Sequence, residues 1–164
     1  MTLNLPPRIG IWRLGPVIHS NELTVIVRSQ PIDAAGSPRW DYVTKLALNS
    51  TGRQAIERSI AAGASVGHPN VVPILDGEVS GEIPFAVSPM LSGRTMRSVL
   101  DDGSRKPLPV ALWFVRQISQ ALSAMHRAGW VHADVKPDNA IVSENGHVTL
   151  IDLGFAHAGT LSPS

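Results

Sequence analysis

The chain has 164 residues, enough for one sizeable core or two small lobes, and its 14 Lys and Arg residues nearly balance 13 Asp and Glu residues. Because no run of five like charges occurs, we expect no nucleic-acid partner. The absence of cysteine excludes disulfides and thiolate metal sites and favours a cytoplasmic location. Because no apolar stretch reaches roughly 18 residues, we expect no membrane span. Because the N-terminus has neither a basic segment nor a sustained apolar segment, we expect no secretory signal.

Four short segments in the first half of the chain predict strands. Residues 23–29 and 40–48 are rich in β-branched and apolar residues and are separated by turn residues, which indicates an antiparallel hairpin. Short apolar runs at residues 71–75 and 85–87 are separated by further turn residues and predict two more strands. The first half is therefore expected to be mainly a β-sheet.

One short helix interrupts these strands. Thr51 and Gln54 match the capping-box pattern, and apolar residues follow at helical spacing. The pattern predicts a helix over residues 53–62 that ends near Gly63.

A longer helix and a hairpin are predicted in the second half. The helix covers residues 110–127 and ends at Gly129. Residues 140–142 and 147–151 flank an Asn-Gly turn and predict the hairpin. The helix is expected to bury one apolar stripe, and Trp113 and Phe114 widen its apolar surface; the stripe consists of Ala111, Val115, Ile118, Leu122 and Met125.

Four polar residues near the end of the chain indicate which chemistry the protein could perform. Asp134 is followed by Lys136 and Asn139 in one loop, and Asp152 follows the predicted hairpin. Phosphoryl transfer uses these residue types: a carboxylate positions the attacking hydroxyl group, a cation offsets phosphate charge, and an amide with a second carboxylate holds Mg²⁺. Each residue alone fits a polar surface loop, but the joint spacing favours a phosphoryl-transfer site.

Three motifs in this region resemble the catalytic loop and the metal-binding motif of the protein kinases: His132-Ala-Asp134, Lys136-Pro-Asp-Asn139 and Asp152-Leu-Gly154. The Lys-Pro pair resembles the serine/threonine branch of the family. The resemblance implies that Asp134 is the catalytic base, that Lys136 contacts the γ-phosphate, and that Asn139 and Asp152 bind Mg²⁺. It also implies ATP as the nucleotide, with a protein substrate that the sequence does not identify.

The resemblance extends to the first half of the chain. Lys45 lies where the family has the lysine that contacts the α- and β-phosphates, and Glu57 is its implied ion-pair partner. Ser88 corresponds to the gatekeeper before the adenine-binding hinge, where the N–H of Leu91 is the implied donor. The implied nucleotide-binding set is Lys45, Glu57, Val43, Ile18, Ile26, Ser88, Met90 and Leu91.

The sequence also departs from the family pattern. Residues 18–27 stand in the position of the glycine-rich phosphate loop but contain no glycine, which is expected to weaken nucleotide binding. Ala133 replaces the arginine that ties the catalytic loop to a phosphorylated activation segment, so control by that route is not expected. Only ten residues follow Gly154, which implies a lower lobe truncated shortly after the metal-binding motif.

We therefore expect an α+β, protein kinase-like fold. A β-rich N-lobe with one regulatory helix is expected over residues 1–90, and an incomplete, mainly helical C-lobe over residues 91–164. The expected function is that of a serine/threonine kinase-like domain that binds ATP and Mg²⁺ and transfers the γ-phosphate to a protein hydroxyl group. The alternative is a catalytically impaired, pseudokinase-like module for nucleotide binding or interaction. The apolar C-lobe surface is expected to promote self-association or to contact a partner.

Two other enzyme classes lack their sequence signatures. The six histidines show neither H-x-x-x-H nor H-E-x-x-H spacing, which argues against a metal hydrolase. No G-x-S-x-G segment is present to form a nucleophile elbow. His132 is therefore expected to be a structural histidine beneath the loop.

Overall fold

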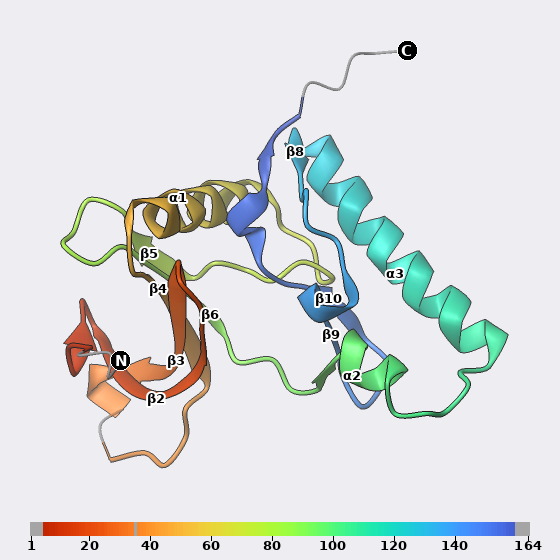
Figure 1. Ribbon diagram of the computed structural model, residues 1–164, viewed down its shortest axis with the longest axis horizontal. Coiled ribbons are helices and arrows are strands. Elements are labelled where there is room, and N and C mark those ends of the chain that lie inside the picture. Colours follow the sequence, from red (N-terminus) through yellow and green to blue (C-terminus); the bar gives the residue numbers. More distant parts are fainter. Residues whose placement is uncertain (1–4, 35, 160–164) are drawn as a thin grey trace. The chain divides into compact units, whose positions relative to one another are not determined.

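The computed structural model describes residues 5–34 and 36–159 (Figure 1). The chain divides into two compact units: Met1–Ile56 with Leu75–Met90, and Glu57–Ile74 with Leu91–Ser164. Residues 57–74, assigned to the first lobe from the sequence, thus group with the second unit. The combination of an antiparallel sheet with helices confirms the α+β class.

The first unit contains a six-stranded antiparallel sheet with the strand order β1-β2-β3-β4-β6-β5, and the sheet curls strongly in Figure 1. One face of this sheet forms an apolar core because alternate residues of each strand point to the same side. The core consists of Trp12, Val25, Val27, Leu46, Phe85 and Val87. The six strands are β1 (Arg8–Ile9), β2 (Trp12–Ser20), β3 (Thr24–Pro31), β4 (Tyr42–Ala47), β5 (Asp76–Glu78) and β6 (Phe85–Pro89).

The helix α1 (Ser50–Ser65) begins and ends differently from the sequence prediction. Its N-terminal cap is Asn49, whose Oδ1 accepts a hydrogen bond of 2.9 Å from the N–H of Gly52, so the predicted cap at Thr51 is wrong. The helix also continues through Gly63, where a Cβ atom would overlap the side chain of Ile74. Gly63 therefore allows Ile74 to pack closely against the helix, and it does not end the helix.

The predicted strand at residues 71–75 is also wrong. Val71 forms only an isolated bridge with Leu150, and the strand β5 begins at Asp76. Val71 and Val72 are buried in the core of the second unit. A short apolar run indicates burial, but periodicity alone does not distinguish a strand from a buried connection.

The second unit combines helices with small sheets (Figure 1). The helix α3 (Leu108–Arg127) and the hairpin of β9 (Ala140–Val142) with β10 (Val148–Leu150) confirm the sequence predictions. Gly129 has a φ of 78° and its N–H bonds to His126 O, as expected for a residue that ends a helix. The remaining elements of the two units are η1 (Ile32–Ala34), β7 (Arg94–Thr95), α2 (Met96–Leu100), β8 (Trp130–Val131), η2 (Pro137–Asn139), η3 (Leu153–Phe155) and β11 (His157–Ala158).

The buried face of α3 overlaps the predicted stripe only in part, since Ile118, Leu122 and Met125 pack in the core but Val115 does not. Phe114, Gln117, Ala121 and Met125 are buried, whereas Val115 is 59% exposed. Apolar residues of the helix also lie outside the predicted stripe, so spacing alone did not identify the buried face. The other face leaves Leu108 and Leu112 exposed, at 70% and 58%. No helix in the described part of the chain is long and apolar enough to span a bilayer.

Candidate active site

The loop at residues 132–139 brings three of the predicted site residues into hydrogen-bond contact. Lys136 Nζ and Asn139 Nδ2 each donate to Asp134 Oδ2, both at 2.7 Å. Asn139 Nδ2 also lies 3.0 Å from the backbone oxygen of Asp134. The Asp134 carboxylate is therefore oriented by two side chains of its own loop.

A buried histidine holds this loop in place through two hydrogen bonds to the backbone. His132 is 1% exposed, and its Nδ1 accepts a hydrogen bond of 3.3 Å from the N–H of Asp134. Because Nδ1 accepts, Nε2 carries the hydrogen and donates to Ile151 O at 3.1 Å. Burial lowers the pKa of His132, which keeps the ring neutral. His132 is therefore the structural histidine expected from the sequence, and it joins the loop to the residue before Asp152.

Asp152 is attached to the same loop through its neighbour. The N–H of Ile151 donates to Asn139 O at 2.9 Å, and Asp152 Oδ1 accepts a hydrogen bond of 3.2 Å from the N–H of Gly154. Asp152 has a φ of 61°, and Ala133 has a φ of 62°. Residues with side chains rarely adopt this left-handed conformation, which costs about 1–2 kcal/mol at each position. The surrounding hydrogen bonds hold the strained backbone in place.

A buried polar network supports the hairpin that leads to Asp152. Gln117 Oε1 accepts hydrogen bonds from Asn70 Nδ2 at 3.1 Å and from the N–H of Val148 at 2.9 Å. Gln117 Nε2 donates to Gly146 O at 2.9 Å. The network thus joins α3 to both the hairpin turn and β10. Sequence reasoning missed Gln117, although a polar residue one turn from two buried apolar positions was the available signal.

The polar groups of the loop suit phosphate and magnesium chemistry. The hydrogen bond to Asp134 raises the pKa of Lys136, so this side chain is a cation. Because Asn139 Nδ2 is already bonded to Asp134, Oδ1 is the amide atom oriented to bind a cation. Asn139 and Asp152 offer oxygen ligands of the type that Mg²⁺ prefers. In the described ranges, no three His, Cys, Asp or Glu residues are grouped so that they could hold a metal ion by themselves.

Four of the predicted nucleotide-binding residues share one face of the sheet in the first unit. Ile26 on β3 lies opposite Lys45 on β4, and Val43 lies opposite Ser88 on β6. Directly paired residues project to the same side, so these four side chains share the face opposite the apolar core. Ile18 is on β2 and is exposed.

The other three residues of the predicted nucleotide set lie outside this sheet face. The N–H of Met90 donates to Asp41 O at 2.8 Å, so it is used within the first unit. Leu91 and Glu57 belong to the second unit, and Glu57 is exposed. The pairing of Glu57 with Lys45 and the hinge role of Leu91 remain predictions.

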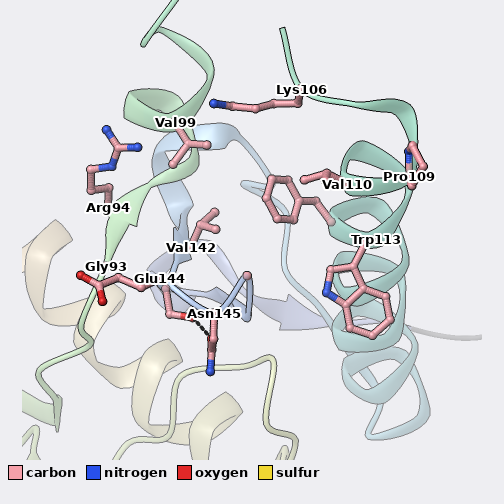
Figure 2. Close-up of a pocket in the computed structure, with 13 residues that line it drawn as sticks. Gly93, Arg94, Val99, Lys106, Pro109, Val110, Trp113, Val142, Glu144 and Asn145 are labelled. Carbon is pink, nitrogen blue, oxygen red and sulfur yellow. Dashed lines mark hydrogen bonds between the residues drawn. The ribbon is translucent and has the colours of Figure 1, made fainter. Parts of the chain in front are cut away.

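A pocket of about 770 Å³ lies elsewhere in the second unit, between α2, α3 and the β9–β10 hairpin (Figure 2). Val99, Val142 and Phe114 form part of its apolar wall, and Arg94 and Lys106 lie near its rim (Figure 2). None of the predicted site residues lines this pocket. The candidate active site is therefore identified by its polar groups and not by a large cavity.

Comparisons with known proteins agree with these observations. Residues 42–163 match the family model for the protein kinase domain. The chain is 37% identical over 167 aligned residues to a probable serine/threonine-protein kinase of Streptomyces coelicolor, covering 93% of this chain and 24% of that protein. It is 32% identical over 100 residues to a probable serine/threonine-protein kinase of Clostridium perfringens, covering 61% of this chain and 15% of that protein.

A third relative is the serine/threonine-protein kinase PknL of Mycobacterium tuberculosis, at 36% identity over 88 residues. The alignment covers 54% of this chain and 22% of PknL. The chain thus spans less than a quarter of the length of each of these three relatives. The family match covers most of the chain and includes all four residues of the candidate active site. The chain belongs to the protein kinase family.

Proposed function

We propose that this chain binds ATP with Mg²⁺ and presents the phosphoryl-transfer groups of a serine/threonine kinase. The observation that carries the proposal is the arrangement of Lys136 and Asn139 on the Asp134 carboxylate, both at 2.7 Å. The names of the three relatives, all serine/threonine-protein kinases, support the same branch of the family. A cytoplasmic location, expected from the absence of cysteine, is part of the proposal.

Each residue of the loop has a distinct role in this proposal. Asp134 orients the hydroxyl group of the protein substrate and receives its proton as the bond from that oxygen to the γ-phosphorus forms. The bond from the γ-phosphorus to the bridging oxygen of the β-phosphate breaks in the same step, and ADP leaves. Lys136 offsets the charge of the transferred phosphate, while Asn139 and Asp152 bind the metal ion. When bound, Mg²⁺ neutralises phosphate charge during the transfer. Lys45 is the proposed contact to the α- and β-phosphates, with Glu57 as its partner.

The nucleotide proposal is tested by calorimetric titration of the 164-residue chain with ATP, with and without Mg²⁺. We expect weak binding that strengthens when Mg²⁺ is present, because the metal ligands remain while the glycine cradle is missing. Asp152→Asn should remove most of the Mg²⁺ dependence, whereas Asp138→Asn should preserve it. Equal affinity with and without Mg²⁺, or no binding at about 1 mM ATP, would contradict the proposal.

A catalytically impaired, pseudokinase-like module is the second candidate function. The turn between β2 and β3 supports this candidate because it contains no glycine and its N–H groups bond within the turn. Phosphate transfer to a generic protein substrate distinguishes the two candidates. Metal-dependent ATP binding without any transfer would favour the impaired module.

Self-association through a second copy is a further part of the proposal. Leu108, Leu112 and Val115 present an exposed apolar face on α3, which supports this expectation. Light scattering of the purified chain should report a mass above that of the monomer. Leu112→Glu should shift the population toward the monomer, whereas Arg116→Glu, which adds a carboxylate at a polar exposed position of the same helix, should not. A monodisperse monomeric wild-type chain would contradict self-association.

A further inference from the structure

The turn that joins β2 to β3 is closed by its own asparagine. Asn21 Oδ1 accepts hydrogen bonds of 2.9 Å from the N–H groups of both Leu23 and Thr24. The N–H of Asn21 donates to Thr24 O at 3.0 Å. Three backbone donors of this turn are therefore used inside it.

The turn is also attached to the corner between β4 and α1. Asn49 Nδ2 donates to Glu22 O at 2.9 Å, and the N–H of Leu48 donates to Leu23 O at 2.8 Å. A Cβ atom at position 52 would overlap Leu23 O, so only glycine permits the first turn of α1 to lie this close. These contacts attach the turn to the residues that follow β4, and they oppose a change in its conformation when a ligand binds.

The turn lies at the end of the sheet that carries Lys45. His19, Ile26 and Lys45 are cross-strand neighbours on β2, β3 and β4, and the turn follows directly after β2. Consecutive backbone N–H groups that converge on one point form an anion-binding nest. In this turn, the point of convergence for Leu23 and Thr24 is occupied by the amide oxygen of Asn21.

We infer that Asn21 determines how the site recognises the phosphates. Its side-chain oxygen accepts the hydrogen bonds that the N–H groups of Leu23 and Thr24 would otherwise donate to a phosphate oxygen. The inference deepens the proposed ATP binding and rests on it. The nucleoside, Lys45 and the metal ion then supply the binding energy, and the turn contributes little. When Mg²⁺ is absent, the wild-type chain should consequently distinguish ATP from adenosine through its lysine contacts alone.

Substitutions at Asn21 should change this discrimination in opposite directions. Asn21→Ala frees the two N–H groups and should tighten ATP binding about tenfold without Mg²⁺, while adenosine affinity stays constant, since hydrogen bonds to charged groups are strong. Asn21→Asp retains the acceptor, adds a negative charge and should weaken ATP binding only. Asn49→Ala is the matched control because it removes the side-chain bond that attaches the turn to the β4–α1 corner but leaves Asn21 in place. Tighter ATP binding in Asn49→Ala would overturn the inference by showing that mobility is the cause.

A second measurement tests the role of Asn21 even if the chain binds no nucleotide. Amide NMR of the 164-residue chain is recorded during titration with inorganic tripolyphosphate. We expect the Leu23 and Thr24 amide signals to shift in Asn21→Ala but not in the wild type. Unshifted signals in Asn21→Ala would overturn the inference. If the wild type and Asn21→Ala bind neither ATP nor adenosine, the proposed function fails while the tripolyphosphate result still tests the role of Asn21.

Discussion

The β2–β3 turn and the loop at residues 132–139 are both held by hydrogen bonds from side chains to backbone, with opposite consequences. In the loop, His132 and Asn139 bind backbone atoms and leave the Asp134 carboxylate oriented at the surface. In the turn, Asn21 takes two N–H groups out of use. The loop therefore leaves its carboxylate available to a ligand, whereas the N–H groups of the turn are already hydrogen-bonded.

The largest expected effect concerns the groups that the loop presents. If phosphate transfer is detected, Asp134→Asn should reduce it at least about 100-fold, because positioning and charge stabilisation supply most of the catalysis. Asp138→Asn is the matched control: Asp138 lies in the same loop but pairs with Arg97 at 3.6 Å. Transfer of labelled phosphate to a protein substrate measures both variants. Transfer that survives Asp134→Asn would show that the residue roles are misassigned.

The next largest effect concerns the stability that hydrogen bonds contribute in each of the two units. Gln117→Leu should lower the free energy of unfolding by about 2–3 kcal/mol, because it leaves the buried N–H of Val148 without its acceptor and removes one of the two acceptors of the Asn70 amide. Asn21→Ala should cost less than about 1 kcal/mol, because Asn21 is exposed and water can replace its bond to the N–H of Leu23. Urea denaturation measures both variants, with the exposed change Gln120→Leu as the control. Equal costs for Gln117→Leu and Asn21→Ala would remove the distinction between the two regions.

The buried histidine should make the second unit sensitive to acid. Burial lowers the pKa of His132 in the folded chain, so the unfolded chain binds a proton more readily. The contribution of His132 to stability is therefore complete above the ordinary histidine pKa of about 6.5 and is lost as the pH falls below it. His132→Gln should flatten the decrease of Tm between about pH 7 and pH 5, measured by thermal melting. The exposed His157→Gln should retain the wild-type slope, and an unchanged slope in His132→Gln would refute the assignment.

The smallest effect concerns strain in the loop. Ala133→Gly should raise the free energy of unfolding by about 0.5–1 kcal/mol, because glycine adopts a φ of 62° without the steric cost of a Cβ atom. Ala61→Gly, at an exposed position of α1, should instead lower it by about 1 kcal/mol. Denaturant titrations compare the two variants. Destabilisation by Ala133→Gly would mean that the loop stores no backbone strain.

Local patterns in the sequence determined much of the fold and the identity of the candidate site. The hairpin at residues 140–151 and the end of α3 at Gly129 follow from an Asn-Gly pair and a helix-stopping glycine, whose conformational preferences act over a few residues. The spacing of Asp134, Lys136, Asn139 and Asp152 identified the site because these residues lie close together along the chain and serve one chemistry. The family match covers residues 42–163 and so includes these four residues, whose roles remain predictions.

Tertiary packing decided the features that depend on distant partners. Val115 and Phe114 are both apolar, but only the contacts of α3 with the rest of its unit select Phe114 for burial. Gln117 gains its role from Asn70 and Val148, which are 47 and 31 residues away along the chain. Local spacing does not encode such contacts, because each one forms only when the folded chain brings its partners within hydrogen-bond distance.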